Sequence, residues 1–155
     1  ILVSRPFTVN DFVKIGDIEG QIEEITINYT MIYTRTRNLV KIPNTQVLNS
    51  RIVHCTKEGI IDYSFTLSCF DHSLSNERVV RKILDPAINE FCREHRERLV
   101  DTPKHYLIDA DRLGKTFSVR LFFQKGDARS LYNLQPVLLE MILDRYYEER
   151  DKKRG

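Results

Sequence analysis

Short runs of alternating apolar and polar residues occupy the first third of the chain. Residues 12–15 precede a turn bounded by glycines, and residues 22–33 then alternate between isoleucine, tyrosine or methionine and polar side chains. Residues 39–42 and 51–56 are two further runs of this kind. Because successive side chains of a strand point to opposite faces, the pattern predicts short β-strands. We therefore expect residues 1–56 to form five short strands in a small barrel or a strongly bent sheet.

From residue 57 onward the pattern predicts helices between strands. Residues 60–70 form an apolar-rich run typical of a strand, and apolar pairs then recur every four residues from 79 to 92. This spacing predicts a helix over 76–99, with Ser75 as its N-cap. We expect an interruption at Asp85-Pro86, because proline has no N–H to donate inside a helix; the helix either kinks there or a second helix begins, with the proline at its first position.

The remaining pattern completes a second domain. Strands are predicted at 105–108 and 116–124, and a helix with one apolar face at 131–149. The order β-α-β-β-α is that of a ferredoxin-like unit without its last strand. The expected fold class is therefore α+β, with a β domain at 1–56 and an α/β domain at 57–155.

Composition adds three limits to this picture. The chain has 155 residues, 41% of them hydrophobic and 30% charged, which is typical of a globular protein. Its net charge of +2 gives no overall attraction to nucleic acid or membrane. Three widely spaced cysteines, Cys55, Cys69 and Cys92, indicate reduced thiols instead of a disulfide framework. No apolar run approaches the roughly 20 residues of a spanning helix, and an opening without Met or a signal peptide predicts a fragment of a longer protein.

No motif in the chain predicts catalysis. Cys69-x-x-His72 and the pair His54-Cys55 contain zinc-ligating residue types, but neighbouring residues of a strand point to opposite faces and no second pair follows. A nucleophile motif of the Gly-x-Ser-x-Gly type, a phosphate-cradling glycine loop and a dinucleotide fingerprint are all missing from the sequence. We expect no enzyme activity, no cofactor and no metal.

Two segments carry a resemblance to a known family. The first runs from Arg5-Pro6-Phe7 through Asp11 to the turn between Gly16 and Gly20, and the second is Ile42-Pro43-Asn44-Thr45-Gln46-Val47-Leu48-Asn49. The glycines allow positive φ around a tight reversal, the prolines fix φ, and Asn44 and Asn49 can close Asx turns. In this order the segments resemble the cytoplasmic region of small-conductance mechanosensitive channels, the MscS family.

The resemblance implies a role for each part of the chain. Arg5, Pro6 and Phe7 would join a pore helix to residues 1–56, a ring-forming, five-stranded Sm-like β-barrel domain beneath the pore. Residues from Ile60 onward would form the wall of a cytoplasmic vestibule. The turn and assembly positions implied by the family are Asp11, Gly16, Gly20, Ile42, Pro43, Asn44, Leu48 and Asn49. The intact protein would be a membrane channel that opens under tension during hypo-osmotic stress.

The resemblance also implies partners. Intact channels of the family are homo-oligomers, heptamers in the best-known members, held in the cell membrane by upstream helices. Ions and small solutes would permeate, and no nucleic acid is expected. This fragment would be soluble on the cytoplasmic side and would associate more weakly than the whole channel.

One departure and one alternative accompany the resemblance. Thr36-Arg37-Asn38 replaces the usual acidic-glycine turn, so Asn38 is expected to supply the tolerant turn position. The alternative is a ring-forming Sm-like RNA-binding protein, since Arg35, Arg37 and Lys41 accompany Tyr33 on one predicted hairpin.

Overall fold

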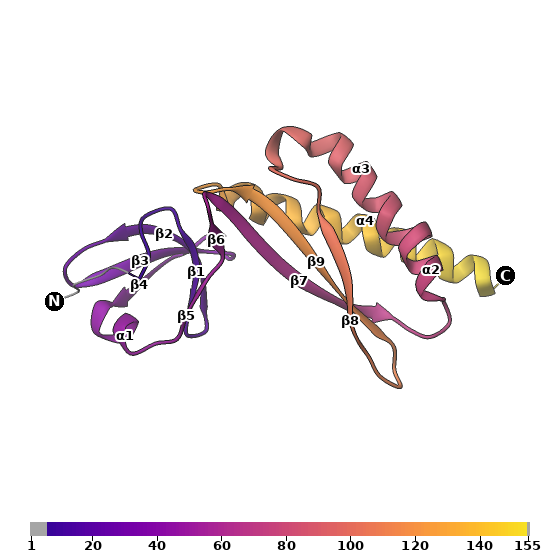
Figure 1. Cartoon of the computed structure of the whole chain (residues 1–155), viewed down its shortest axis with the longest axis horizontal. Helices are drawn as coiled ribbons and strands as arrows, with labels where there is room; N and C mark the ends of the chain where they lie inside the picture. The colour runs from indigo at the N-terminus through magenta and orange to yellow at the C-terminus, as the bar shows by residue number, and fades with distance from the viewer. Residues whose placement is uncertain (1–5, 155) are drawn as a thin grey trace. The chain divides into compact units, whose positions relative to one another are not determined.

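The chain has a mixed α/β fold with two antiparallel sheets (Figure 1), seen in a computed structural model that describes residues 6–154. The predicted α+β class is therefore confirmed. The chain forms two compact units: Ile1–Asp62 with Phe123–Tyr132, and Tyr63–Phe122 with Asn133–Gly155. The first unit includes a segment from the second half of the sequence, which the predicted division at residue 56 leaves out. The division of the chain into a domain at 1–56 and a domain at 57–155 remains a prediction.

The first unit is built on a five-stranded sheet with the order β4-β3-β2-β1-β5. Residues 6–57, which contain this sheet, are called the β-domain below. A short helix, α1 (Asn44–Leu48), follows β4 directly. The inward side chains form one apolar core: Phe7, Val13, Ile15, Ile22, Ile32, Ile42 and Val47. The strands are β1 (Phe12–Ile15), β2 (Ile18–Ile25), β3 (Tyr29–Thr34), β4 (Leu39–Pro43) and β5 (Ile52–His54).

The long alternating run at 22–33 is two strands and not one. The chain reverses between β2 and β3, where the Thr26 hydroxyl oxygen accepts the N–H groups of Asn28 and Tyr29. Ile27 lies at the tip with 95% of its surface exposed. The alternation of apolar residues continues through this turn, so the period alone does not reveal it.

The predictions made for Gly20 and for Asn38 need correction, whereas the one for Gly16 does not. Gly16 has a positive φ of 62°, as expected. Gly20 lies within β2 without a positive φ, and a Cβ there would meet the carbonyl oxygen of Tyr33 at 2.2 Å. Gly20 is therefore required for close approach of β2 and β3 and not for the turn. The residue with positive φ before β4 is Arg37, at 68°, and not Asn38.

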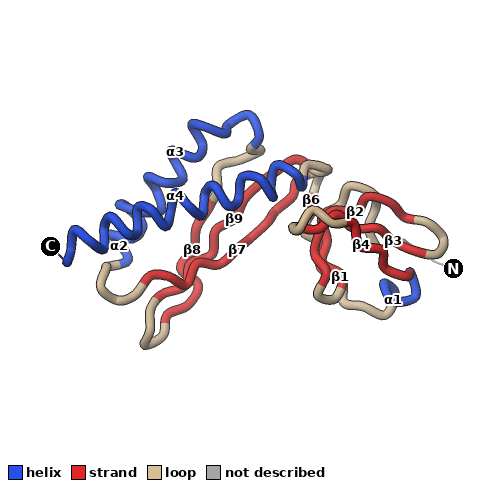
Figure 2. Tube along the Cα trace, turned by 180° about the vertical axis from the view of Figure 1, so that it is seen from behind, coloured by secondary structure: helices blue, strands red, loops and turns tan. Residues whose placement is uncertain are grey.

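A second sheet has the order β6-β7-β9-β8. Its strands are β6 (Thr56–Lys57), β7 (Ile60–Phe70), β8 (Lys104–Ala110) and β9 (Lys115–Gln124). Helices α3 (Asp85–His95) and α4 (Ala128–Arg154) lie on the same face of β7, β8 and β9 (Figures 1 and 2). Phe70 of β7 packs edge-on against Phe117 of β9 and Tyr146 of α4, which forms the aromatic centre of this layer.

The first helix of the second unit begins at the predicted cap. The Ser75 hydroxyl oxygen accepts the N–H of Arg78 at 3.2 Å, and α2 (Asn76–Arg78) follows. The chain then widens into a π-helical segment, Val79–Leu84, before α3 begins. Pro86 donates no N–H, and its ring crowds the carbonyl four residues earlier. The expected interruption at Asp85-Pro86 therefore takes the form of a π-helical segment just before the proline, and a short 3-10 turn, Arg96–Arg98, ends the helix.

Gly20→Ala is expected to destabilise the first unit by about 3 kcal/mol, because the new methyl group would collide with backbone atoms of Tyr33 and disturb the pairing of Gly20 with Thr34. Chemical denaturation measures the loss. Gly59→Ala is the matched control, since a Cβ there meets nothing within 4 Å and the cost is limited to about 1 kcal/mol for its positive φ. Equal losses in both variants would contradict this explanation.

Candidate functional site

The predicted junction begins with residues fastened to the five-stranded sheet. Arg5 lies outside the described residues. The carbonyl oxygen of Pro6 accepts a hydrogen bond from His54 Nε2 on β5. Phe7 is 4% exposed and belongs to the apolar core of the sheet. The start of the β-domain is therefore held to the sheet by one buried aromatic ring, that of Phe7, and by one hydrogen bond, between Pro6 and His54.

Asp11 holds the next turn of this segment. Its Oδ2 accepts the N–H of Thr8 at 2.8 Å, and its Oδ1 lies 3.3 Å from Nζ of Lys125, which also donates to the Thr8 hydroxyl. Burial alone would raise the pKa of the Asp11 carboxyl. The hydrogen bond from Thr8 and the charge of Lys125 outweigh burial, so the pKa lies below its ordinary value of 3.8.

Lys125 belongs to the segment Phe123–Tyr132, which makes several contacts with the β-domain. Gln21 Oε1 accepts the N–H of Ala128 at 2.9 Å, in a buried position where α4 begins. The Tyr132 hydroxyl donates to the carbonyl oxygen of Tyr33 at 3.2 Å. Sequence reasoning missed these partners, because no local pattern relates residues that lie a hundred positions apart.

Asn44 fastens α1 to the tip of the β2–β3 hairpin. Its Nδ2 donates to the carbonyl oxygens of Thr26 and Ile27 at 2.7 and 3.0 Å, and its Oδ1 accepts from the Thr30 hydroxyl at 2.8 Å. Pro43, with φ of −57°, immediately precedes the helix. The side chain closes contacts with a distant loop instead of a local Asx turn, which explains why an asparagine suits this position.

The predicted assembly stretch divides into inward and outward residues. Ile42 and Val47 are 2% and 3% exposed and belong to the core. Leu48 is 56% exposed at the end of α1, and Asn49 donates from Nδ2 to the carbonyl oxygen of Thr45. Leu48 is therefore the apolar side chain of this stretch that faces outward.

An unpaired strand edge lies on the same sheet. Among the residues that the structure describes, β4 is the last strand in the order and pairs with β3 alone. Leu39, at the start of β4, is largely exposed. An edge strand presents backbone N–H and C=O groups that another chain can pair with. The name β4 surface is used here for this edge together with two exposed apolar side chains close to it in the sequence, Leu39 of β4 and Leu48 of α1.

Two of the basic hairpin residues, Arg37 and Lys41, contact aromatic rings of the protein itself, and so does Arg129 of α4. The Arg37 guanidinium carbon lies 5.7 Å from the ring centre of Tyr132. The Arg129 guanidinium carbon lies 4.8 Å from the ring centre of Tyr33, and Tyr132 packs on Tyr33 at 5.8 Å between ring centres. Lys41 Nζ lies 4.3 Å from the ring centre of Tyr29. Tyr33 is buried, so its faces do not offer a platform for stacking a base.

The described part of the chain holds no group of three His, Cys, Asp or Glu side chains arranged for a metal. Burial raises the pKa of all three thiols, Cys55, Cys69 and Cys92, above 9.0, so they are neutral at physiological pH. Among residues 6–154, no helix combines the length and apolar character needed to cross a bilayer.

The first 57 residues are similar to a known protein domain. Residues 1–57 match the model of the mechanosensitive ion channel β-domain. Over 56 residues, 36% of this chain, the sequence is 41% identical to the small-conductance mechanosensitive channel MscMJ of Methanocaldococcus jannaschii. Over 95 residues, 61% of this chain, it is 28% identical to an uncharacterized MscS family protein of Aquifex aeolicus. The matched regions span 16% and 25% of those two proteins.

Structural comparison extends the likeness to the whole fold. The crystal structure of Helicobacter pylori MscS in its closed state matches 93% of this chain and 54% of that chain, with a TM-score of 0.55 and 19% sequence identity. This similarity concerns the fold alone. The resemblance seen in the sequence is confirmed as a similarity: residues 1–57 match the mechanosensitive ion channel β-domain, and longer stretches of the chain are similar to MscS-family proteins.

Proposed function

We propose that this chain is the cytoplasmic vestibule part of a mechanosensitive ion channel that opens under membrane tension during hypo-osmotic stress. The observation that carries the proposal is the match of residues 1–57 to the channel β-domain, with 41% identity to a small-conductance channel. In the intact protein this region lies on the cytoplasmic side of the cell membrane and is joined to upstream pore helices. Ions and small solutes would reach the pore through it.

The proposed junction consists of Arg5, Pro6 and Phe7. The structure supports this role at Phe7, since an aromatic ring buried in the β-domain core resists displacement when the preceding chain is pulled. The Pro6–His54 hydrogen bond and the Asp11–Lys125 ion pair add two ties within a few residues. Force on the upstream chain would therefore reach the sheet directly.

We further interpret the β-domain as an Sm-like barrel and the second unit as a ferredoxin-like unit without its last strand. The order β7-β9-β8 supports the second interpretation, because a split βαβ unit places another strand between the two that its helix connects. In this proposal β-domains form a homo-oligomeric ring through the β4 surface. Head-to-tail contacts between identical subunits close into rings.

The alternative, an Sm-like RNA-binding ring, is less well supported. Sequence-tolerant RNA binding requires aromatic faces on which bases stack. Tyr33 and Tyr29 instead stack with Arg129 and Lys41 of the same chain. Retention on an RNA column that falls steeply with salt would favour the alternative.

Leu48→Asp is expected to weaken self-association through the β4 surface at least tenfold, a change of about 1.4 kcal/mol. Its side chain is 56% exposed, so a charge there is solvated in the monomer and buried only on association. Sedimentation and light scattering over a wide concentration range would show a rising mass for the wild type and a constant monomer mass for the variant.

Leu113→Asp is the matched control, because Leu113 is 77% exposed and belongs to the second unit, so it is not part of the β4 surface. It is expected to associate like the wild type. A wild-type chain that stays monomeric when concentrated would show that the β-domain alone does not carry assembly. Equal weakening by both variants would show that the surface is wrongly assigned.

Asp11→Asn tests the anchoring of the junction through pH. Because the pKa of Asp11 is lowered on folding, its ion pair stabilises the protein above the ordinary value of 3.8 and this stabilisation is lost as the pH falls through the folded-state pKa. The variant should unfold about 1.5–3 kcal/mol more easily near neutral pH, the range for hydrogen bonds to charged groups. The difference from the wild type should shrink below about pH 4.

Urea denaturation at a series of pH values measures this difference. Asp17→Asn, in the exposed turn after β1, is the control and should change the free energy of unfolding by less than about 0.5 kcal/mol throughout. A gap between Asp11→Asn and the wild type that is the same at acidic and neutral pH would show that the Asp11 ion pair does not hold the junction.

A further inference from the structure

A surface pocket in the second unit is lined mainly by positive side chains. Its volume is about 350 Å³, and its lining residues are Ser75, Glu77, Arg78, Arg81 and Lys82. Three of these carry a positive charge and one a negative charge. The pocket lies on the opening turns of the first helix of this unit, including the π-helical segment that holds Arg81 and Lys82. Segments of this kind occur frequently at functional sites.

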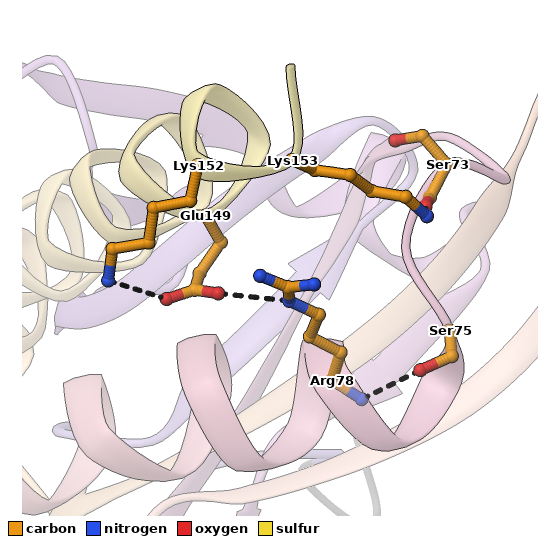
Figure 3. Close-up of polar contacts among 6 residues, drawn as sticks. All are labelled: Ser73, Ser75, Arg78, Glu149, Lys152 and Lys153. Atoms are coloured by element: carbon orange, nitrogen blue, oxygen red, sulfur yellow. Dashed lines mark hydrogen bonds and ion pairs between the residues drawn. The ribbon is translucent and has the colours of Figure 1, made fainter. Parts of the chain in front are cut away.

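Arg78 is held in place at both ends. Its backbone N–H donates to the Ser75 hydroxyl oxygen, and its Nε donates at 3.0 Å to Oε2 of Glu149 on α4 (Figure 3). Glu149 is only 7% exposed, and its other oxygen accepts from Lys152 at 3.2 Å. Within residues 6–154, the two terminal nitrogens of Arg78 make no hydrogen bond to protein. A buried carboxylate therefore orients a guanidinium whose outer N–H groups remain available.

Glu149 stays charged under physiological conditions. Burial would raise the pKa of its carboxyl, but the hydrogen bonds from Arg78 and Lys152 and their charges outweigh burial and lower it below 4.5. The orientation of Arg78 is therefore maintained at neutral pH. Lys153 on the same helix turn donates to the carbonyl oxygen of Ser73, so the loop before Ser75 is also fastened to α4 (Figure 3).

The other two cations are weakly engaged. Arg81 pairs with Glu77 at 3.0 Å, and both side chains are at least 70% exposed, which makes the pair weak and easily exchanged. Lys82 is exposed and makes no ion pair within the described part of the chain. An anion in the pocket would meet one oriented arginine and two adaptable positive side chains.

We propose that this pocket binds the phosphate group of a small phosphate-bearing anion. The planar fork of a guanidinium matches two oxygens of a phosphate, and the charge-assisted hydrogen bonds formed are stronger than those between neutral groups. The Ser75 hydroxyl has its own hydrogen to donate to a third oxygen, since its oxygen accepts from Arg78. This inference stands independently of the channel function proposed above.

Isothermal titration calorimetry with inorganic pyrophosphate tests the proposal, at a constant ionic strength of about 0.15 M, where distant charges are screened. The wild-type chain should show saturable binding with one site. Arg78→Gln should weaken binding at least about tenfold, as expected for loss of a charged hydrogen-bonding group. Arg145→Gln is the matched control, because Arg145 also pairs with a glutamate, Glu90 at 3.1 Å, but lies outside the pocket lining. It should bind like the wild type.

Glu149→Gln distinguishes an oriented site from general attraction to positive charge. The variant keeps every cation but loses the carboxylate that orients Arg78, so binding should weaken several-fold. If net charge alone attracts the anion, the same variant should bind more tightly, and the proposal is wrong. Lys82→Gln, at an exposed position where folding is not at risk, should weaken binding to a lesser degree.

A second titration, with ATP in the absence of divalent cations, distinguishes the source of the phosphate. Tighter binding of ATP than of pyrophosphate, sensitive to Arg78→Gln, supports a nucleotide as the ligand. Equal binding of both supports a bare polyphosphate group. Absence of saturable binding of either anion to the wild type, or equal losses in Arg78→Gln and Arg145→Gln, overturns the proposal.

Discussion

The first N–H groups of a helix have no partner within the helix, and this constraint decides how the first unit is completed. α4 begins in a buried position at Ala128, where an unsatisfied N–H would be costly. Gln21, on the second strand of the β-domain, supplies the acceptor. Without the Ala128 N–H, the buried side-chain oxygen of Gln21 would in turn lack a hydrogen-bond donor. One hydrogen bond therefore satisfies a buried donor of α4 and a buried acceptor of the β-domain. The segment Phe123–Tyr132 is for this reason a structural part of the first unit.

The same reciprocity explains Asp11 and Tyr132. The Asp11 carboxylate, at the turn before β1, is stabilised by the charge of Lys125. The buried hydroxyl of Tyr132 donates a hydrogen bond to the carbonyl oxygen of Tyr33. Both partners come from the segment that follows β9. The part of the chain that matches the family model, residues 1–57, therefore contains the strands of this sheet but not all of the hydrogen-bonding partners of its buried polar groups.

The strands and helices were largely predictable because burial imposes a period on the sequence. β1 was predicted with its observed bounds, and the Ser75 cap follows from a hydroxyl residue just before an apolar period of four. The β2–β3 turn was not predictable from the period, since Ile25, Ile27 and Tyr29 continue the alternation through a turn that contains neither glycine nor proline. Asn44, the first residue of α1, stabilises that turn: its Oδ1 accepts from the Thr30 hydroxyl and its Nδ2 donates to the carbonyl oxygen of Thr26. A pattern of neighbouring residues does not predict a contact between positions this far apart in the sequence.

The sequence predicted which residues belong to the candidate site but not what each of them does in the structure. Gly20 and Ile42 belong to motif segments whose residues were assigned to turns and assembly, yet both contribute to close packing, Gly20 because a backbone oxygen occupies the place of its side chain. Leu48 is the member whose apolar side chain faces solvent. Exposure separates these cases, because a residue buried in the monomer has already lost its contact with water and gains little further free energy by association. Within the motif segments, residues that shape the β-domain and residues able to join it to another copy are therefore different residues, although they are adjacent in the sequence.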